Sequence, residues 1–162
     1  MKVLVIYDSQ YGNTEQVAKA ISGAFGAEGK AVKIGEVKRE EIKDYDLIFI
    51  GSPTQGGRHS LGMKAFLDNL PKEVLAGKRL AAFDTRLKTV FVKMFGYAAP
   101  RIESAIKAMG GNSTAQPQGF FVKSAKGPVL DGELERAAAW AKAAAAGVPT
   151  NLMSGFEDKQ KG

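Results

Sequence analysis

Two kinds of hydrophobic pattern alternate along the whole chain. Short runs rich in β-branched and aromatic residues, typical of buried strands, occupy residues 2–7, 31–34, 45–50, 79–83 and 119–122. Between these runs apolar residues recur every three or four positions, which predicts helices over residues 13–25, 61–70, 100–109 and 134–146. Glycine or proline follows each predicted helix and marks its end, at Gly26, Pro71, Gly110 and Gly147.

The same spacing predicts which side of each helix is buried. On the second helix the apolar face is formed by Leu61, Ala65, Phe66 and Leu70. On the last helix, which is rich in alanine, it is formed by Leu134, Ala138 and Ala141.

Strands that alternate with helices predict an α/β fold, a doubly wound five-stranded parallel sheet with helices on both faces. We expect one domain over residues 1–148, followed by a polar C-terminal tail over residues 149–162. In such sheets ligands bind beyond the carboxyl ends of the strands. The loops after the first, third and fourth strands are therefore the candidate sites.

Composition narrows the chemistry. The 162 residues contain no cysteine and a single histidine, His59, which excludes disulfides, thiolate metal sites and cysteine nucleophiles. Redox chemistry would therefore need an organic cofactor, and no metal is expected. The chain has no apolar stretch of about 18 residues and no signal-peptide pattern, so we expect no membrane association and a cytoplasmic protein.

The loop after the first strand carries candidate anion-binding residues. Ser9, Asn13 and Thr14 offer two hydroxyls and an amide where a helix begins, and Gly12 allows the backbone to approach closely. The unpaired amides at a helix start favour a phosphate there, held by neutral donors because the loop contains no lysine. The alternative is an ordinary turn in which Ser9 or Asn13 only caps the helix.

At this loop the sequence resembles a known family. Ser9-Gln10-Tyr11-Gly12-Asn13-Thr14 is similar to the Ser/Thr-x-Thr-Gly-x-Thr phosphate loop of flavodoxins, and closer to the Ser-x-Tyr/Trp-Gly-x-Thr variant in the flavodoxin domains of larger flavoproteins. The resemblance implies a flavodoxin-like fold, FMN as a non-covalent cofactor, and a function in electron transfer.

Two further loops share this resemblance. Pro53, Thr54, Gln55, Gly56 and Gly57 occupy the place of the flavodoxin loop that passes along the isoalloxazine ring, where a glycine peptide can turn its carbonyl towards ring nitrogen N5. Asp84, Thr85 and Arg86 occupy the place of the loop that supplies backbone donors to the pyrimidine edge. The next segment, residues 87–96, is either a lid over the cofactor or the start of a helix.

Two features differ from a typical flavodoxin. No aromatic residue lies in the two ring-side loops, so the candidates for stacking on the ring are Tyr11, Phe91, Phe95 and Tyr97, each of which has a core position as its alternative. The formal net charge is +6, whereas flavodoxins are typically acidic. Because positive charge stabilises anionic reduced flavin, Arg58, Arg86 and Lys88 predict a less reducing cofactor. His59 is either a proton carrier or an exposed loop residue.

Basic residues are concentrated in one stretch. Residues 78–107 contain seven of them, namely Lys78, Arg79, Arg86, Lys88, Lys93, Arg101 and Lys107. This region is either a solvated face or a docking surface for an acidic redox partner.

We therefore predict an FMN-binding electron carrier that exchanges electrons with redox partner proteins. The alternative is an FMN-dependent NAD(P)H:quinone or related reductase, although such enzymes generally carry longer insertions. A phosphoryl-accepting receiver domain is disfavoured because the third strand ends in Gly51-Ser52 rather than in an aspartate. Nucleic-acid binding is disfavoured because the basic stretch lacks interleaved exposed aromatic residues and a recognised nucleic-acid-binding module.

Overall fold

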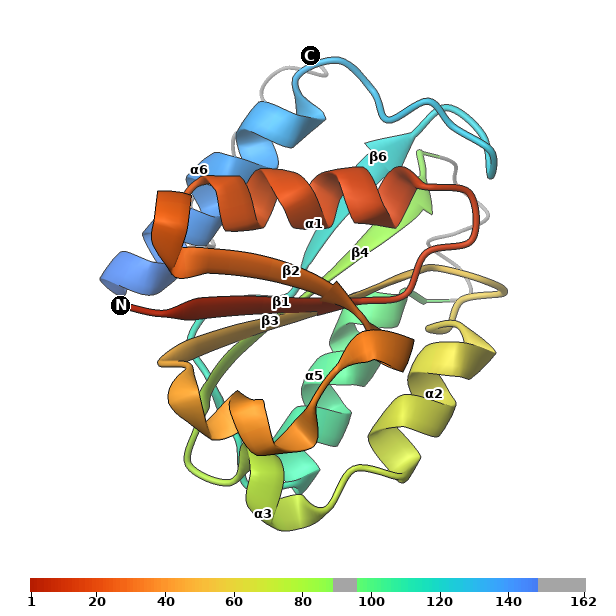
Figure 1. Ribbon diagram of the computed structural model, residues 1–162. Coiled ribbons are helices and arrows are strands. Elements are labelled where there is room, and N and C mark those ends of the chain that lie inside the picture. Colours follow the sequence, from red (N-terminus) through yellow and green to blue (C-terminus); the bar gives the residue numbers. More distant parts are fainter. Residues whose placement is uncertain (89–95, 149–162) are drawn as a thin grey trace.

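A twisted parallel sheet lies between two layers of helices (Figure 1). The computed structural model describes residues 1–88 and 96–148. The predicted tail at 149–162, and residues 89–95 of the segment predicted as a lid or helix start, lie outside the described residues.

The strands are β1 (Val3–Tyr7), β2 (Gly29–Lys33), β3 (Leu47–Pro53), β4 (Arg79–Leu87), β5 (Asn112–Ser113) and β6 (Gln118–Val122). They pair in the order β2-β1-β3-β4, and both β5 and β6 pair with β4. Because β5 pairs with residues 79–80 and β6 with residues 83–87, the two form one interrupted fifth strand along β4. The doubly wound parallel sheet is confirmed, with its fifth strand in two pieces.

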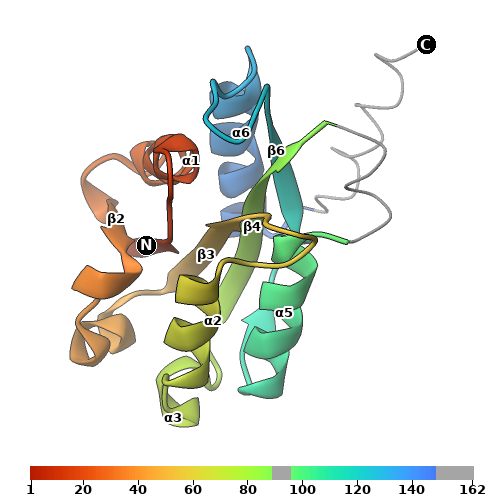
Figure 2. The same ribbon diagram turned by 90° about the vertical axis from the view of Figure 1, so that its right-hand side faces the viewer.

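The helices are α1 (Asn13–Gly23), α2 (Leu61–Asp68), α3 (Lys72–Leu75), α5 (Ala98–Ala108) and α6 (Glu133–Ala146). Short 3-10 helices, η1 (Gly26–Glu28), η2 (Ile34–Glu36) and η3 (Arg39–Asp44), flank β2. Helices α1 and α6 cover one face of the sheet, and α2, α3 and α5 cover the other (Figures 1 and 2).

Two hydrophobic cores follow from the alternation of side chains along each strand. In β1, Val3, Val5 and Tyr7 pack with the α1 and α6 layer, whereas Leu4 and Ile6 pack with the α2 and α5 layer. A strand that is apolar at every position is therefore expected, since both of its faces are buried.

Helix α6 buries a different face from the predicted one. Its buried residues include Ala137, Trp140, Ala141 and Ala144, whereas Leu134 and Ala138 are only partly buried. The indole of Trp140 lies among three phenylalanine rings, with centroids 5.3 Å from Phe49, 6.4 Å from Phe83 and 5.8 Å from Phe120. The large ring sets the rotation of the helix, because the small alanines around it leave room for close approach to the sheet.

Helix α2 is also rotated relative to the prediction. Of the predicted face, Leu70 is buried and Phe66 is partly buried against the core, but Leu61 is 83% exposed and Ala65 is exposed. Met63 and Leu67 are buried in addition. The start of the helix explains the rotation: the Ser60 hydroxyl accepts a hydrogen bond from the Met63 amide and donates one to Asp8 at the end of β1. This tether fixes which side of the helix faces the sheet.

Strands β3 and β4 continue beyond their predicted ends at residues 50 and 83. Gly51, Ser52 and Pro53 stay in the sheet, opposite Phe83, Asp84 and Thr85. A Cβ atom on Gly51 would overlap the Phe83 ring, so the glycine serves close packing inside the strand rather than a turn. The two strands therefore carry residues of the predicted binding loops as sheet residues.

Candidate functional site

A cavity opens at the carboxyl ends of β1, β3, β4 and β6, on the side where α1 begins. It is lined by Ser9, Gln10, Tyr11, Asn13, Thr14, Pro53, Thr54, Gln55, Thr85, Arg86, Leu87, Val122 and Ala125. The structure thus brings together residues from all three predicted loops, at the edge of the sheet where ligands of doubly wound folds bind.

The loop after β1 is arranged to present unpaired donors to this cavity. Gly12 is the N-cap of α1 with φ 94° and has no side chain of its own to cap the helix. The Ser9 hydroxyl oxygen accepts from the amides of Gly12 (3.0 Å) and Glu15 (3.4 Å), so its own hydrogen is available to a ligand. Among the described residues, the amides of Asn13 and Thr14 have no acceptor. The first turn of α1 therefore retains donors for an anion.

Two hydroxyls meet at the floor of the site. Thr14 Oγ1 lies 2.9 Å from Thr85 Oγ1, and both side chains are buried. Since either oxygen can be the donor, the pair links the start of α1 to β4 and leaves one hydroxyl hydrogen for a ligand.

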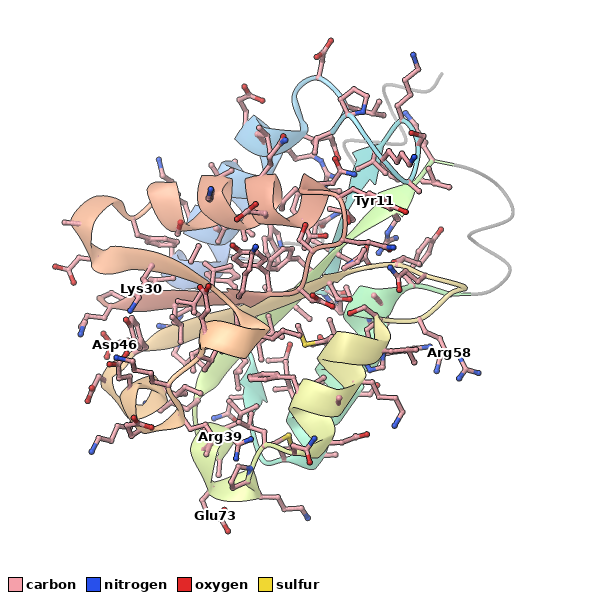
Figure 3. All side chains as sticks on the ribbon, turned by 45° about the vertical axis from the view of Figure 1, so that its right-hand side comes forward. Tyr11, Lys30, Arg39, Asp46, Arg58 and Glu73 are labelled. Atoms are coloured by element: carbon pink, nitrogen blue, oxygen red, sulfur yellow. The ribbon has the colours of Figure 1, made fainter. Side chains whose placement is uncertain are left out.

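The rim of the cavity is connected across the first and third loops. Gln55 Nε2 donates to Gln10 Oε1 at 2.6 Å, and Gln10 Nε2 lies 3.4 Å from the Tyr11 hydroxyl. Tyr11 is 49% exposed and lies at the cavity, which makes it, among the described aromatic side chains, the one best placed to cover a ring (Figure 3).

The other stacking candidates are placed differently. The Tyr97 ring is covered by the Arg86 guanidinium, whose Cζ lies 3.4 Å from the ring centroid, and Tyr97 does not line the cavity. Phe91 and Phe95 lie outside the described residues.

The adjacent glycines form a tight turn beside the site. Gln55 and Arg58 exchange backbone hydrogen bonds of 2.8 and 3.1 Å around Gly56 (φ 56°) and Gly57 (φ 78°). Two consecutive positive φ values are those of a type I′ turn, which L side chains rarely adopt. The two glycines do not line the cavity, and the Gly57 carbonyl accepts from Arg101 Nε at 3.2 Å.

Asp84 has a structural environment rather than a position at the cavity. Its carboxylate is fully buried and bound by the Arg86 guanidinium through two contacts of 2.7 Å, and it accepts from the Ala99 amide at 2.9 Å. The neighbouring Ala98 amide donates to Thr54 Oγ1 at 3.1 Å. Asp84 and Thr54 therefore cap α5, which explains why this helix begins at Ala98 rather than at the predicted residue 100.

The backbone of residues 84–86 also differs from the expectation. These residues are not a free loop but part of β4, paired with β3 on one side and β6 on the other. Their peptide groups therefore take part in strand pairing, and Thr85 and Arg86 line the cavity through their side chains.

One wall of the cavity was predicted only in part: Leu87 lies in the segment predicted as a lid or helix start, whereas Val122 and Ala125 were not predicted. Leu87, Val122 and Ala125 line it, and the segment after β6 is tied to the phosphate loop by a hydrogen bond from Asn13 Nδ2 to the Ala125 carbonyl (3.1 Å). The signal was present, because the rule that ligands lie beyond strand ends applies to the fifth strand as well.

The basic residues of the 78–107 stretch do not share one face. Lys78 binds the carbonyls of Lys43 and Tyr45, at the amino end of β3, whereas Arg86 and Lys88 lie at the carboxyl ends of the strands. Lys107 forms an ion pair with Glu103 on α5. The stretch is split because β4 runs the length of the sheet, so that residues before and after this strand lie at opposite ends. The predicted docking surface over this region is therefore wrong as a single surface.

The Glu15 carboxylate is turned away from the cavity by a buried tyrosine. Tyr7 Oη donates to Glu15 Oε1 at 2.8 Å, and Glu15 is not among the lining residues. Burial, followed by this hydrogen bond, raises the pKa of Tyr7 to about 12, and the same bond lowers the pKa of Glu15. The negative charge of Glu15 is thus fixed beside β1, where it does not oppose an anionic ligand.

A pH prediction follows from the Tyr7 hydroxyl. Because its folded pKa lies above the unfolded value of about 10, it contributes stability that is present below pH 10 and lost as pH rises towards 12. We expect the tyrosinate absorbance of the wild type minus that of Tyr7→Phe to titrate near pH 12. A difference spectrum that titrates near the ordinary value of about 10 would contradict the buried hydrogen bond.

Comparison with known proteins gives consistent results. The family model of the flavodoxin domain matches residues 4–121. A flavodoxin of Picosynechococcus sp. is 30% identical over 118 residues, which are 71% of this chain and 69% of that protein. An NAD(P)H dehydrogenase (quinone) of Caulobacter vibrioides is 36% identical over 90 residues, 41% of this chain and 45% of that protein. A solved flavodoxin from the domain Archaea superposes with a TM-score of 0.73 at 25% identity, over 87% of this chain and 94% of that one.

Proposed function

The chain belongs to the flavodoxin family, and on that premise we propose that it is an electron carrier that holds FMN at the carboxyl edge of the sheet. Its cofactor is FMN, as the resemblance in the phosphate loop implied. The observation that carries the proposal is the start of α1, where the free amides of Asn13 and Thr14 and the hydroxyls of Ser9 and Thr14 converge on one cavity. When bound, FMN supplies one- and two-electron redox chemistry that no side chain of this chain provides.

Different residues at the cavity would bind different parts of FMN. We assign the phosphate to the loop over residues 9–14 and the ring side to Pro53, Thr54 and Thr85, with Tyr11 covering the exposed face of the ring. Gly56 and Gly57 lie in a turn that can rotate a peptide at low conformational cost, with the Gly57 carbonyl held by Arg101. Asp84, held by Arg86, positions this wall by capping α5 together with Thr54.

The ion pairs near the cavity bear on which cations would change the reduction potential of the cofactor. Arg86 is paired with Asp84, so its charge is largely compensated. Arg58 and Lys88 are exposed and have no ion pair among the described residues. We propose that these two, rather than all three cations, make the cofactor less reducing than that of an acidic flavodoxin.

A reductase acting on NAD(P)H and a quinone is the second candidate. The relatives named NAD(P)H dehydrogenase (quinone) favour it. The match to the Caulobacter protein of that name covers less than half of that protein's length. Against it, residues 54–60 connect β3 to α2 through one tight turn, held at both ends by Thr54–Thr85 and Ser52–Ser60 hydrogen bonds. This connection contains no inserted segment that would cover a second substrate.

The proposal for partners and location has a general part and a more specific part. As flavodoxins do, the carrier exchanges electrons with redox partner proteins, and no helix in the described part of the chain is long and apolar enough to cross a membrane. The cytoplasmic location remains a prediction, as does docking of acidic partners. Of the basic stretch at 78–107, only its part near the cavity, around Lys88, fits such docking.

The test separates carrier from reductase. We expect the purified protein, or the protein after addition of FMN, to be yellow and to release FMN on acid precipitation. The reduced protein should pass electrons to a protein acceptor, while NADPH is oxidised negligibly in the presence of benzoquinone. Rapid NADPH oxidation would support the reductase, and a colourless protein that takes up no FMN would contradict both.

A further inference from the structure

Four exposed cations lie next to segments that line the cavity. Arg58, Lys88, Lys123 and Lys126 are all exposed, and none has an ion pair within residues 1–88 and 96–148. Lys88, Lys123 and Lys126 each directly follow a lining residue in sequence, and Arg58 closes the turn that begins at the lining residue Gln55. They come from three separate segments, so this set, which we call the basic rim, is visible only in the fold.

The carboxylates near this edge do not neutralise the basic rim. Glu15 forms an ion pair with Lys19 and Asp84 is buried with Arg86, so these two charges are already balanced. Asp8 keeps its negative charge and accepts a hydrogen bond from Ser60. Asp131 is set back from the mouth, because the preceding residue pairs through its amide with the Phe121 carbonyl inside β6. Within residues 1–88 and 96–148, the four cations of the basic rim therefore outnumber the carboxylates near this edge that have no ion pair.

The basic rim also carries apolar surface. Lys88 Nζ lies 5.5 Å from the centroid of the Phe121 ring, and Tyr11 is half exposed beside the cavity. Tyr11 and Arg58 lie on the same side of the molecule, remote from Glu73 on α3 (Figure 3). An aromatic side chain surrounded by long cationic ones is a composition found in protein docking surfaces.

We infer that the basic rim is the docking surface for a protein partner that presents carboxylates around its own redox centre. This inference rests on the proposed carrier function, since a partner docked here lies over the cofactor. Opposite charge raises the rate of encounter and orients the partner towards the cavity mouth. A nucleic acid is the poorer fit, because stacking on single strands needs successive aromatic platforms, and the described residues at this mouth offer one exposed ring, that of Tyr11.

The test uses the FMN-loaded, reduced protein and two protein oxidants of opposite charge, an acidic rubredoxin and a basic cytochrome c, in stopped-flow mixing. With rubredoxin we expect a bimolecular rate that is highest at low ionic strength and falls as salt is added; with cytochrome c we expect the opposite trend. Lys123→Glu combined with Lys126→Glu should lower the low-salt rubredoxin rate about tenfold or more. The matched control, Lys72→Glu with Lys142→Glu, makes the same change of net charge at exposed positions away from the mouth.

Two further measurements keep this inference separate from the proposed function. FMN affinity and the rate with uncharged benzoquinone should be unchanged in both double variants. If FMN binds and rubredoxin is reduced, but its rate is independent of salt or falls equally in the control, the docking inference is overturned while the carrier function stands. Loss of FMN binding by the wild type would overturn the function itself. Tight retention of a single-stranded oligonucleotide, lost only in the rim variant with rubredoxin rates unchanged, would assign the rim to nucleic acid and overturn a protein partner.

Discussion

Replacing Ser9 by alanine or Thr14 by valine is expected to weaken FMN binding about 10- to 100-fold for each change. A hydrogen bond to a charged group contributes about 1.5–3 kcal/mol, and about 1.4 kcal/mol corresponds to a factor of ten in affinity. Each substitution removes a hydroxyl from the loop over residues 9–14. Ser9 Oγ accepts from two amides and keeps its hydrogen for a ligand, and Thr14 Oγ1 can donate to a ligand while it accepts from Thr85. Titration of the apoprotein with FMN, followed by the quenching of flavin fluorescence, measures the effect.

A control on the same helix separates binding from folding. Ser22 bonds the Lys19 carbonyl at 3.2 Å, at the far end of α1, so Ser22→Ala should leave FMN affinity unchanged. The urea midpoint of each apoprotein reports damage to the loop itself, because Ser9 also organises the turn and Thr14 is buried. Affinities within about threefold of the wild type for both site variants would show that no phosphate is held at the start of α1.

The sequence was sufficient to predict a doubly wound parallel sheet, though not its strand order, and most of the cavity lining, for a physical reason. Strand runs buried on both faces, such as β1 and β3, are continuous in hydrophobicity, and parallel strands bring their following loops to one edge. The loop over residues 9–14 could be assigned because a strand, a short polar turn and a helix start follow one another directly. Local sequence determines all three.

The structure differs from the sequence prediction where contacts between residues distant in the chain determine the packing. The face of α2 depends on the Ser60–Asp8 contact, and that of α6 on Trp140 among three phenylalanines, neither of which follows from helical spacing. Asp84 was predicted to lie at the cofactor, whereas the structure buries it under Arg86 at the start of α5. The local sequence around such an acidic residue is the same whether it binds a cofactor or caps a helix. Only the packing of the start of α5 against this residue distinguishes the two roles.

The loss of the Asp84 carboxylate is expected to destabilise the protein strongly, by about 3–5 kcal/mol for Asp84→Ala. Removing it leaves the Arg86 guanidinium, only 14% exposed, without its partner and deprives the Ala99 amide of its acceptor. A large part of the cost is therefore the desolvation of a charge that stays buried, rather than the ion-pair attraction alone. Urea unfolding of the apoprotein measures this without a contribution from FMN binding.

The exposed pair between Lys64 and Asp68 provides the comparison, because its contact of 2.6 Å is as short as the 2.7 Å contact of Asp84 with Arg86. Both side chains of the exposed pair are more than half accessible, so Asp68→Ala should cost less than about 1 kcal/mol. Equal losses for the two variants would show that Asp84 is not a buried cap. A stable Asp84→Ala protein with weakened FMN binding would instead place its carboxylate at the cofactor.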